Sequence, residues 1–154
     1  MTEKNSPADP KAANEAWEAL MTAHAHLTRV FAAEGTWDKT SMREYDVLYT
    51  LTKGGRPMRI CEIHDGVLLS QPALSRLIDR LDARGLVRRE ADTNDGRAVR
   101  VSLTDEGVRV QREVGRAHAR SVTREVGEAL TEEEIHQLRH LCDKLAQKSG
   151  ENND

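Results

Sequence analysis

The chain has 154 residues, of which 38% are hydrophobic, 32% are charged and only 3% are aromatic. This length fits one domain with helical extensions, whose core must come mainly from aliphatic side chains. No apolar run is long enough to cross a bilayer, the N-terminus has no apolar secretory segment, and two cysteines cannot form a disulfide framework. These features exclude membrane-spanning and disulfide-rich secreted proteins and predict a small helical protein of the cytoplasm.

The formal net charge of -3 hides an uneven distribution along the chain. Residues 47–124 carry 15 Lys and Arg against 10 Asp and Glu, whereas the segments on both sides have an acidic excess. A basic surface between acidic ends can engage a polyanion locally. A solvated helical face rich in arginine explains the same composition, so charge alone does not decide between the two.

The first predicted helix covers residues 13–33, where the apolar side chains recur at helical spacing. Residues 1–12 are polar and contain two prolines, so we expect a disordered N-terminal segment. Gly35 ends the helical region, which gives an N-terminal helical segment over 13–35.

A second helix begins at the capping box formed by Ser41 and Glu44, and the Lys53–Pro57 segment ends it. A short strand over 58–60 and a short helix over 61–67 follow. We expect Cys61, next to the inward-facing Ile60, to be a small buried apolar residue.

The fourth predicted helix runs from about residue 70 to 84, with Ser70 as its N-cap and Gly85 just beyond its end. Its buried stripe has the spacing i, i+3, i+4 and i+7 and consists of Leu74, Leu77, Ile78 and Leu81.

A β-hairpin is predicted over about 86–103, with its turn in the polar cluster 92–96. Thr104 caps a long helix to residue 129, and a second capping box opens a last helix over 131–148. The two form a C-terminal helical region over 105–148, and we expect a disordered tail over 149–154.

The helices at 61–67 and 70–84 together predict a helix-turn-helix, and the hairpin adds a wing. The face of helix 70–84 opposite its apolar stripe is small and polar near the N-terminal end, which suits approach to base edges in a major groove. Arg76 can bind a guanine through two hydrogen bonds, and Arg80 and Arg84 are spaced for phosphates. Ser70, Gln71 and Ser75 can also reach bases or phosphates. An ion-paired helix face with Asp79 and Asp82 is the structural alternative.

These segments resemble the MarR family of winged-helix regulators, which occurs in bacteria and archaea. The strongest element is Asp95-Gly96-Arg97 followed by Val99, Val101 and Leu103-Thr104, which is similar to the family's wing signature. Gly96 stands where many members place a second arginine. The resemblance extends over about residues 13–148 and implies a mainly α fold with a small β-hairpin wing. In this fold a winged helix-turn-helix core (36–104) is flanked by N- and C-terminal dimerisation helices.

The resemblance implies that Arg97 is the wing arginine that enters the minor groove of duplex DNA. It also implies that Asp95 orients the Arg97 guanidinium through a charge-assisted pair, although Asp95 can equally be a simple turn former.

The family further implies a homodimer, an operator with two pseudo-palindromic half-sites, and an unidentified small effector, often aromatic or anionic. On this resemblance residues that the first two helices turn inward line the effector cleft, and Asp46, Arg76 and Arg88 are similar to positions used by the urate-responsive branch. The candidates are Trp17, Met21, His24, Tyr45, Asp46 and Arg88. That branch has an extra N-terminal helix, which this chain is too short to supply, and ordinary core packing is the alternative for Trp17, Met21, His24 and Tyr45.

Other chemistries are less well supported by the sequence. His136 and His140 are spaced i, i+4, but no third metal ligand lies near them in sequence, so we predict no metal site and no cofactor. No phosphate-binding loop or nucleophile motif indicates an enzyme. We therefore expect a DNA-binding regulator, more specifically a ligand-released repressor. The alternative is a winged-helix protein-interaction module without specific DNA binding.

Overall fold

The computed structural model of the chain describes residues 8–148 and divides it into two compact units, one ending at Gly35 and the other beginning at Thr36. Within residues 8–148 no helix is apolar over a stretch long enough to cross a membrane.

The first unit contains α1 (Pro10–Ala32), which begins earlier than predicted. Asp9 caps the helix by accepting the backbone N–H of Lys11, and Pro10 occupies the first turn, where no amide donor is needed. The expected disordered segment over 1–12 is therefore wrong for Pro10 to Ala12, and residues 1–7 lie outside the described part.

The second unit begins its secondary structure with α2 (Met42–Gly54). The predicted capping box is confirmed, since the Glu44 amide donates to Ser41 Oγ and the Ser41 amide donates to Glu44 Oε2. Gly55 ends the helix in the left-handed conformation at φ 63°, which glycine adopts without steric cost.

The helix-turn-helix consists of α3 (Ile60–His64) and α4 (Gln71–Ala83). Ser70 Oγ accepts the Ala73 amide at the start of α4, and Gly85, at φ 70°, follows its end. The predicted stripe on α4 is buried together with residues from α2, α3, the sheet and α5, which form one hydrophobic core. Cys61 on α3 is exposed, so the expectation of a buried thiol is wrong. The reason is that α3 turns Ile63, and not Cys61, into the core.

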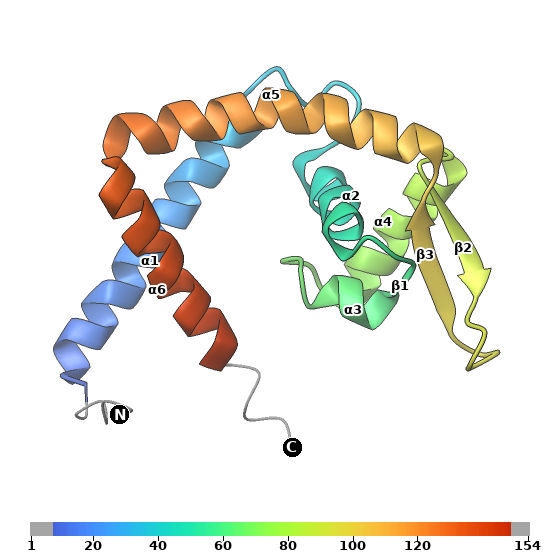
Figure 1. Cartoon of the computed structure of the whole chain (residues 1–154), viewed down its shortest axis with the longest axis horizontal. Coiled ribbons are helices and arrows are strands. Elements are labelled where there is room, and N and C mark those ends of the chain that lie inside the picture. The colour runs from blue at the N-terminus through green and yellow to red at the C-terminus, as the bar shows by residue number, and fades with distance from the viewer. Residues whose placement is uncertain (1–7, 149–154) are drawn as a thin grey trace. The chain divides into compact units, whose positions relative to one another are not determined.

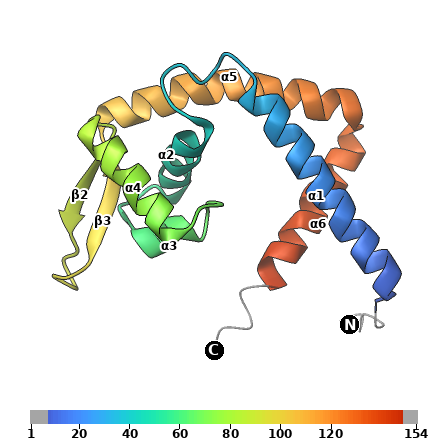
Figure 2. The ribbon, with the colours of Figure 1, turned by 180° about the vertical axis from the view of Figure 1, so that it is seen from behind.

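The wing is a three-stranded antiparallel sheet of β1 (Met58–Arg59), β2 (Val87–Ala91) and β3 (Val99–Leu103), in the order β1-β3-β2. Val87 pairs with Leu103 and Ala91 with Val99, so the hairpin has the predicted partners. Figure 1 shows the hairpin of β2 and β3 projecting near the beginning of α5, and Figure 2 shows α3 and α4 beside it from behind.

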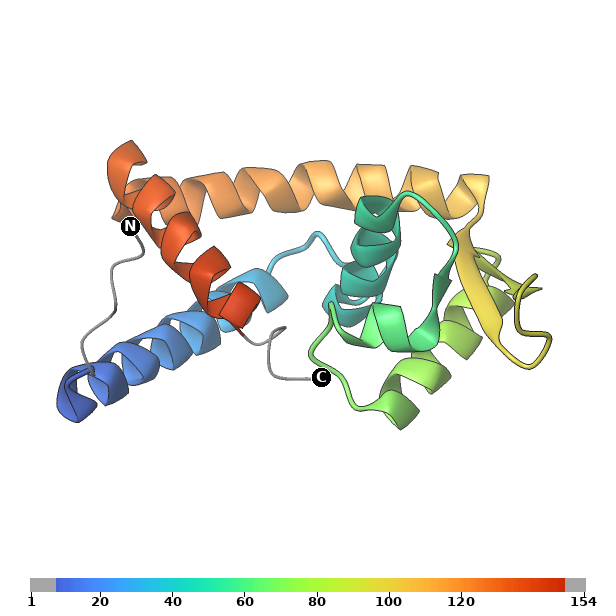
Figure 3. The ribbon, with the colours of Figure 1, turned by 60° about the horizontal axis from the view of Figure 1, so that its bottom comes forward.

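Two helices complete the second unit, α5 (Asp105–Ala129) and α6 (Glu132–Lys148). Thr104 links the wing to α5, because its hydroxyl accepts the Gly107 amide and donates to the Gly85 carbonyl. In Figure 3, α6 turns back from the far end of α5. The predicted tail over 149–154 lies outside the described residues.

Candidate nucleic-acid interface and effector cavity

The exposed face of α4 carries the side chains predicted to read DNA. Because Leu74, Leu77 and Ile78 point into the core, Arg76 faces outward, and Gln71 is exposed in the first turn of the helix. Ser70, also exposed, uses its hydroxyl oxygen as the helix cap. Arg80 is exposed as well, and Ser75 is half-buried.

The arginines of α4 differ in what they contact. Among residues 8–148, Arg76 makes no ion pair. Arg84 donates from Nη1 to Glu44 Oε2 at 3.0 Å and from Nη2 to the Lys39 carbonyl. These bonds hold α4 against the start of α2. The spacing of Arg84 predicted a phosphate contact, but its guanidinium is occupied within the chain. Arg80 Nε lies 3.9 Å from Glu44 Oε1 with its side chain largely exposed, a distance that leaves it able to turn outward.

The ion-paired α4 face that was the alternative is present, but its partners differ from those expected, and among the described residues it does not include Arg76. Asp79 pairs with Arg89 of β2, and Asp82 Oδ2 lies 4.0 Å from Arg89 Nε. These pairs link the outer face of α4 to the wing and leave Arg76 available for contacts outside the chain.

The wing loop places Arg97 on the surface. Asp95 Oδ1 accepts the backbone N–H of Arg97 at 3.1 Å. No ion pair joins the Arg97 guanidinium to Asp95 in the described residues, so the predicted side-chain pair is absent from the free chain. Asp95 fixes the backbone at Arg97 and leaves its guanidinium unpaired, which matches the turn-forming alternative.

Asp92 is a site residue that sequence reasoning missed, because it was placed only in the turn cluster. Its carboxylate is fully buried and lies 2.7 Å from Arg59 Nη2 and 3.1 Å from Arg100 Nε. The Asn94 amide and the guanidiniums of Arg59 and Arg100 hold the pKa of Asp92 well below its usual range. The available signal was an aspartate at the end of β2 with arginines in the other two strands, Arg100 in β3 and Arg59 in β1.

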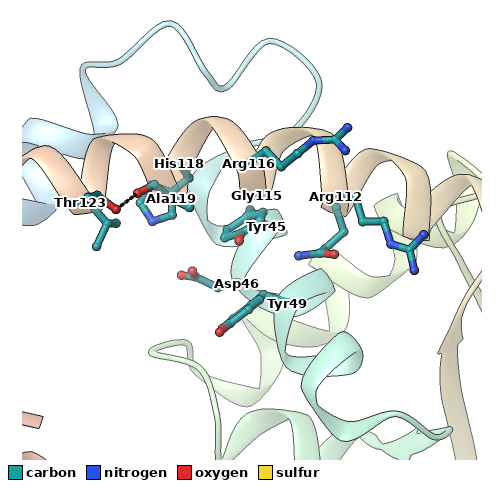
Figure 4. A pocket seen from close by; sticks show the side chains of 11 residues that line it. Tyr45, Asp46, Tyr49, Arg112, Gly115, Arg116, His118, Ala119 and Thr123 are labelled. Carbon is teal, nitrogen blue, oxygen red and sulfur yellow. Dashed lines mark hydrogen bonds between the residues drawn. The ribbon is translucent and has the colours of Figure 1, made fainter.

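A cavity of about 690 Å³ lies between α2 and α5 in the second unit. In Figure 4, Tyr45, Asp46 and Tyr49 come from α2, whereas Arg112, Arg116 and His118 come from α5. The rings of Tyr45 and Tyr49 are stacked with centroids 5.9 Å apart. Burial raises the pKa values of Asp46 and Tyr45. The cavity thus combines aromatic faces with two arginines.

The structure brings together only part of the predicted effector site. Tyr45 and Asp46 line the cavity, but Arg88 does not, because it lies on β2 with its Nε 3.0 Å from Glu90 Oε1. Trp17, Met21 and His24 are exposed on α1 of the first unit, which contradicts ordinary core packing, the alternative given for these residues. Their place in an effector site stays a prediction. The sequence did not predict Arg112 and Arg116 as site residues, because arginines spaced i, i+4 are also typical of a helix face exposed to solvent.

His136 and His140 are exposed on α6. In the part of the chain that the structure describes, no group of three or more His, Cys, Asp or Glu side chains is arranged to hold a metal ion.

Comparison with known proteins identifies relatives by sequence. The sequence model of the MarR family matches residues 40–98. The chain is 33% identical over 109 residues to the HTH-type transcriptional regulator PecS of Dickeya dadantii (strain 3937), and this match covers 70% of this chain and 65% of PecS. It is 35% identical over 101 residues to the HTH-type transcriptional repressor MdtR of Bacillus subtilis (strain 168), and this match covers 66% of this chain and 64% of MdtR. The chain thus spans less than two thirds of either relative in these matches.

A solved structure supports the same fold over nearly the whole chain. The crystal structure of the PcaV transcriptional regulator from Streptomyces coelicolor, in complex with its natural ligand, superimposes with a TM-score of 0.66 at 25% identity. The match covers 97% of this chain and 99% of PcaV.

Proposed function

Because this chain belongs to the MarR family of winged helix-turn-helix transcriptional regulators, we propose that it binds a pseudo-palindromic duplex DNA site as a homodimer. The observation that carries the proposal is the pair of outward arginines without ion-pair partners within residues 8–148, Arg76 on α4 and Arg97 in the wing loop. Arg76 is suited to a guanine edge in the major groove, and Arg97 to the narrow minor groove beside it.

A gel shift with the DNA that flanks the protein's own gene tests this proposal. We expect Arg97→Ala to weaken binding by about tenfold or more and to lower the salt slope by about one, because one phosphate or groove contact is lost. Arg139→Ala, which changes an exposed arginine of α6, is the matched control and leaves affinity unchanged. Unaltered affinity of a folded Arg97→Ala protein at physiological salt would contradict the wing assignment.

The same gel shift, repeated at several salt concentrations, distinguishes DNA binding from the alternative function, a winged-helix protein-interaction module. Such a module gives a shallow salt slope and no footprint on the flanking DNA. The steep slope expected here reflects release of counterions from several phosphates.

Homodimer formation is supported by exposed apolar side chains on α6. Leu138, Leu141 and Leu145 are 45%, 56% and 62% exposed in the single chain. Contiguous exposed leucines of this kind indicate a surface that another chain covers.

We further propose that the protein is a repressor released by an aromatic or anionic small molecule in the cavity between α2 and α5. The stacked tyrosines suit a ring, and Arg112 and Arg116 suit a carboxylate. The complex of the similar protein PcaV with its natural ligand supports ligand control in a chain of this fold.

A panel of aromatic carboxylates added to the gel shift tests the effector proposal. We expect at least one to release wild-type protein from DNA and Arg116→Ala to need about tenfold more of it, since a charge-assisted contact is lost. Arg120→Ala changes an exposed arginine of α5 outside the cavity lining and should respond like the wild type. Equal sensitivity of Arg116→Ala and wild type would place the effector elsewhere.

A further inference from the structure

The buried carboxylate of Asp92 joins three segments at the base of the wing loop. Asp92 Oδ2 accepts from Arg59 Nε at 2.8 Å and lies 3.1 Å from Arg100 Nε, and Oδ1 accepts the Asn94 amide at 2.9 Å. Arg59 lies on β1, which leads directly into the helix-turn-helix at Ile60, whereas Arg100 lies on β3. One side chain therefore connects the loop, the hairpin and the segment that precedes α3.

The sheet register explains why a carboxylate is needed at this place. Arg59 and Arg100 are direct partners across β1 and β3. Like charges directly opposite in a sheet repel each other, and both side chains are partly shielded from water. Asp92 lies against both guanidiniums and neutralises this repulsion.

A short series of hydrogen bonds runs from Asp92 to Arg97. The Asp92 amide donates to the Ala98 carbonyl at 2.9 Å, and the Ala98 amide donates to the Asp95 carbonyl at 2.9 Å. Asp95 in turn accepts the Arg97 amide through its side chain. The hydrogen bond between Asp92 and Ala98 thus closes the loop that carries Arg97.

We propose that Asp92 is a positioning residue for the wing, which fixes the loop on β1 and β3 so that Arg97 meets the minor groove, without touching DNA itself. The inference rests on the proposed DNA-binding function. Loss of the Asp92 charge leaves Arg59 and Arg100 opposed and frees the loop, while α4 keeps its own packing in the core.

Two footprints of the full chain on its binding site test this inference. Hydroxyl-radical cleavage reports the minor groove, and methylation of guanine N7 reports the major groove. We expect Asp92→Asn to lose the minor-groove protection, to retain the guanine protection and to bind about tenfold more weakly. A purely structural weakening would reduce both protections together.

A double variant tests whether Asp92 acts through Arg97. Since Asp92 acts through Arg97, the double variant Asp92→Asn with Arg97→Ala should bind no more weakly than Arg97→Ala alone. Glu90→Gln, which removes an exposed carboxylate of β2, is the matched control and keeps both protections. If Asp92→Asn does not fold by circular dichroism, Arg59→Gln removes one partner and should show the same selective loss.

Protection that disappears equally in both grooves, or affinity losses that add in the double variant, would overturn the inference. Intact minor-groove protection in folded Asp92→Asn would do the same. A wild-type protein that protects no DNA would overturn the proposed function itself, and this result is obtained before any variant is compared.

Discussion

Glu62 connects the start of the helix-turn-helix to the segment before it. Its carboxylate accepts from Arg56 Nη2 at 2.6 Å and from the Arg59 amide at 2.7 Å. These contacts, the Arg56 hydrogen bond foremost, lower the pKa of Glu62 to about 2. The pKa of Asp92 is lowered in the same direction, first by the Asn94 amide and then by its arginines. Two carboxylates at the base of the wing thus favour the ionised form.

The lowered pKa values predict acid sensitivity. A carboxylate whose folded pKa lies below its unfolded value, about 4.3 for Glu, stabilises the fold above that value and loses this effect as the pH falls toward the folded pKa. We expect Glu62→Gln to melt at a lower temperature than wild type at pH 7. The difference should shrink between about pH 4.3 and pH 2, where the wild-type carboxylate becomes protonated. Melting curves across this range check the prediction, and a difference that is constant with pH would contradict it.

At the scale of the elements, the start of α5 depends on a close backbone approach. Gly107 in the first turn is buried against the Leu86 carbonyl, which also accepts the Thr104 amide. A Cβ at position 107 would overlap that carbonyl oxygen, and backbone cannot move aside as a flexible side chain can. The junction of wing and α5 therefore requires glycine at this position.

Gly107→Ala should lower the free energy of unfolding by about 1–3 kcal/mol, the usual cost of overpacking. Gly127→Ala lies in the same helix with open space around it and should raise stability by about 0.5–1 kcal/mol, because alanine favours the helix. Urea unfolding of both variants checks the contrast. A Gly107→Ala protein as stable as wild type would mean that α5 shifts without cost.

At the scale of the whole molecule, both terminal helices leave apolar side chains on the surface of the chain. No residue of α1 is buried, and Trp17 and Met21 are 60% and 44% exposed. The leucines of α6 are similarly exposed. Removing apolar surface from water is favourable by roughly 25 cal/mol per Å². Burial of these side chains between two chains therefore favours association.

Leu141→Glu should convert the proposed dimer into a monomer at micromolar concentration, because a carboxylate would be buried without a partner. Gln147→Glu adds the same charge to α6 at an exposed polar residue on the side opposite the leucines and should leave the dimer intact. Light scattering after size exclusion distinguishes the two masses. A monomeric wild type would contradict the dimer proposal.

Much of the fold could be predicted from the sequence because its signals are local. Ser41 with Glu44, Ser70 and Thr104 cap helices through partners three residues away, and Gly55 and Gly85 end helices by their own backbone conformation. Apolar spacing assigned the core face of α4 in the same way. Such patterns depend on few neighbouring residues, which is why they can be recognised without coordinates, and the proposed DNA-binding residues on α4 were predicted from them.

Only the tertiary structure decided which charges meet. Arg84 pairs with Glu44 forty positions away, and Arg59 with Asp92 thirty-three positions away. No local pattern marks such pairs, so Arg84 and Arg88 were given binding roles, Cys61 was expected in the core, and the arginines of the cavity were missed. The elements and the exposed face of α4 were determined by the sequence itself, because short-range sterics and hydrogen bonding fix them. Packing decided the contacts of Asp92 with Arg59 and Arg100 and the cavity between α2 and α5, because both exist only when distant segments come together.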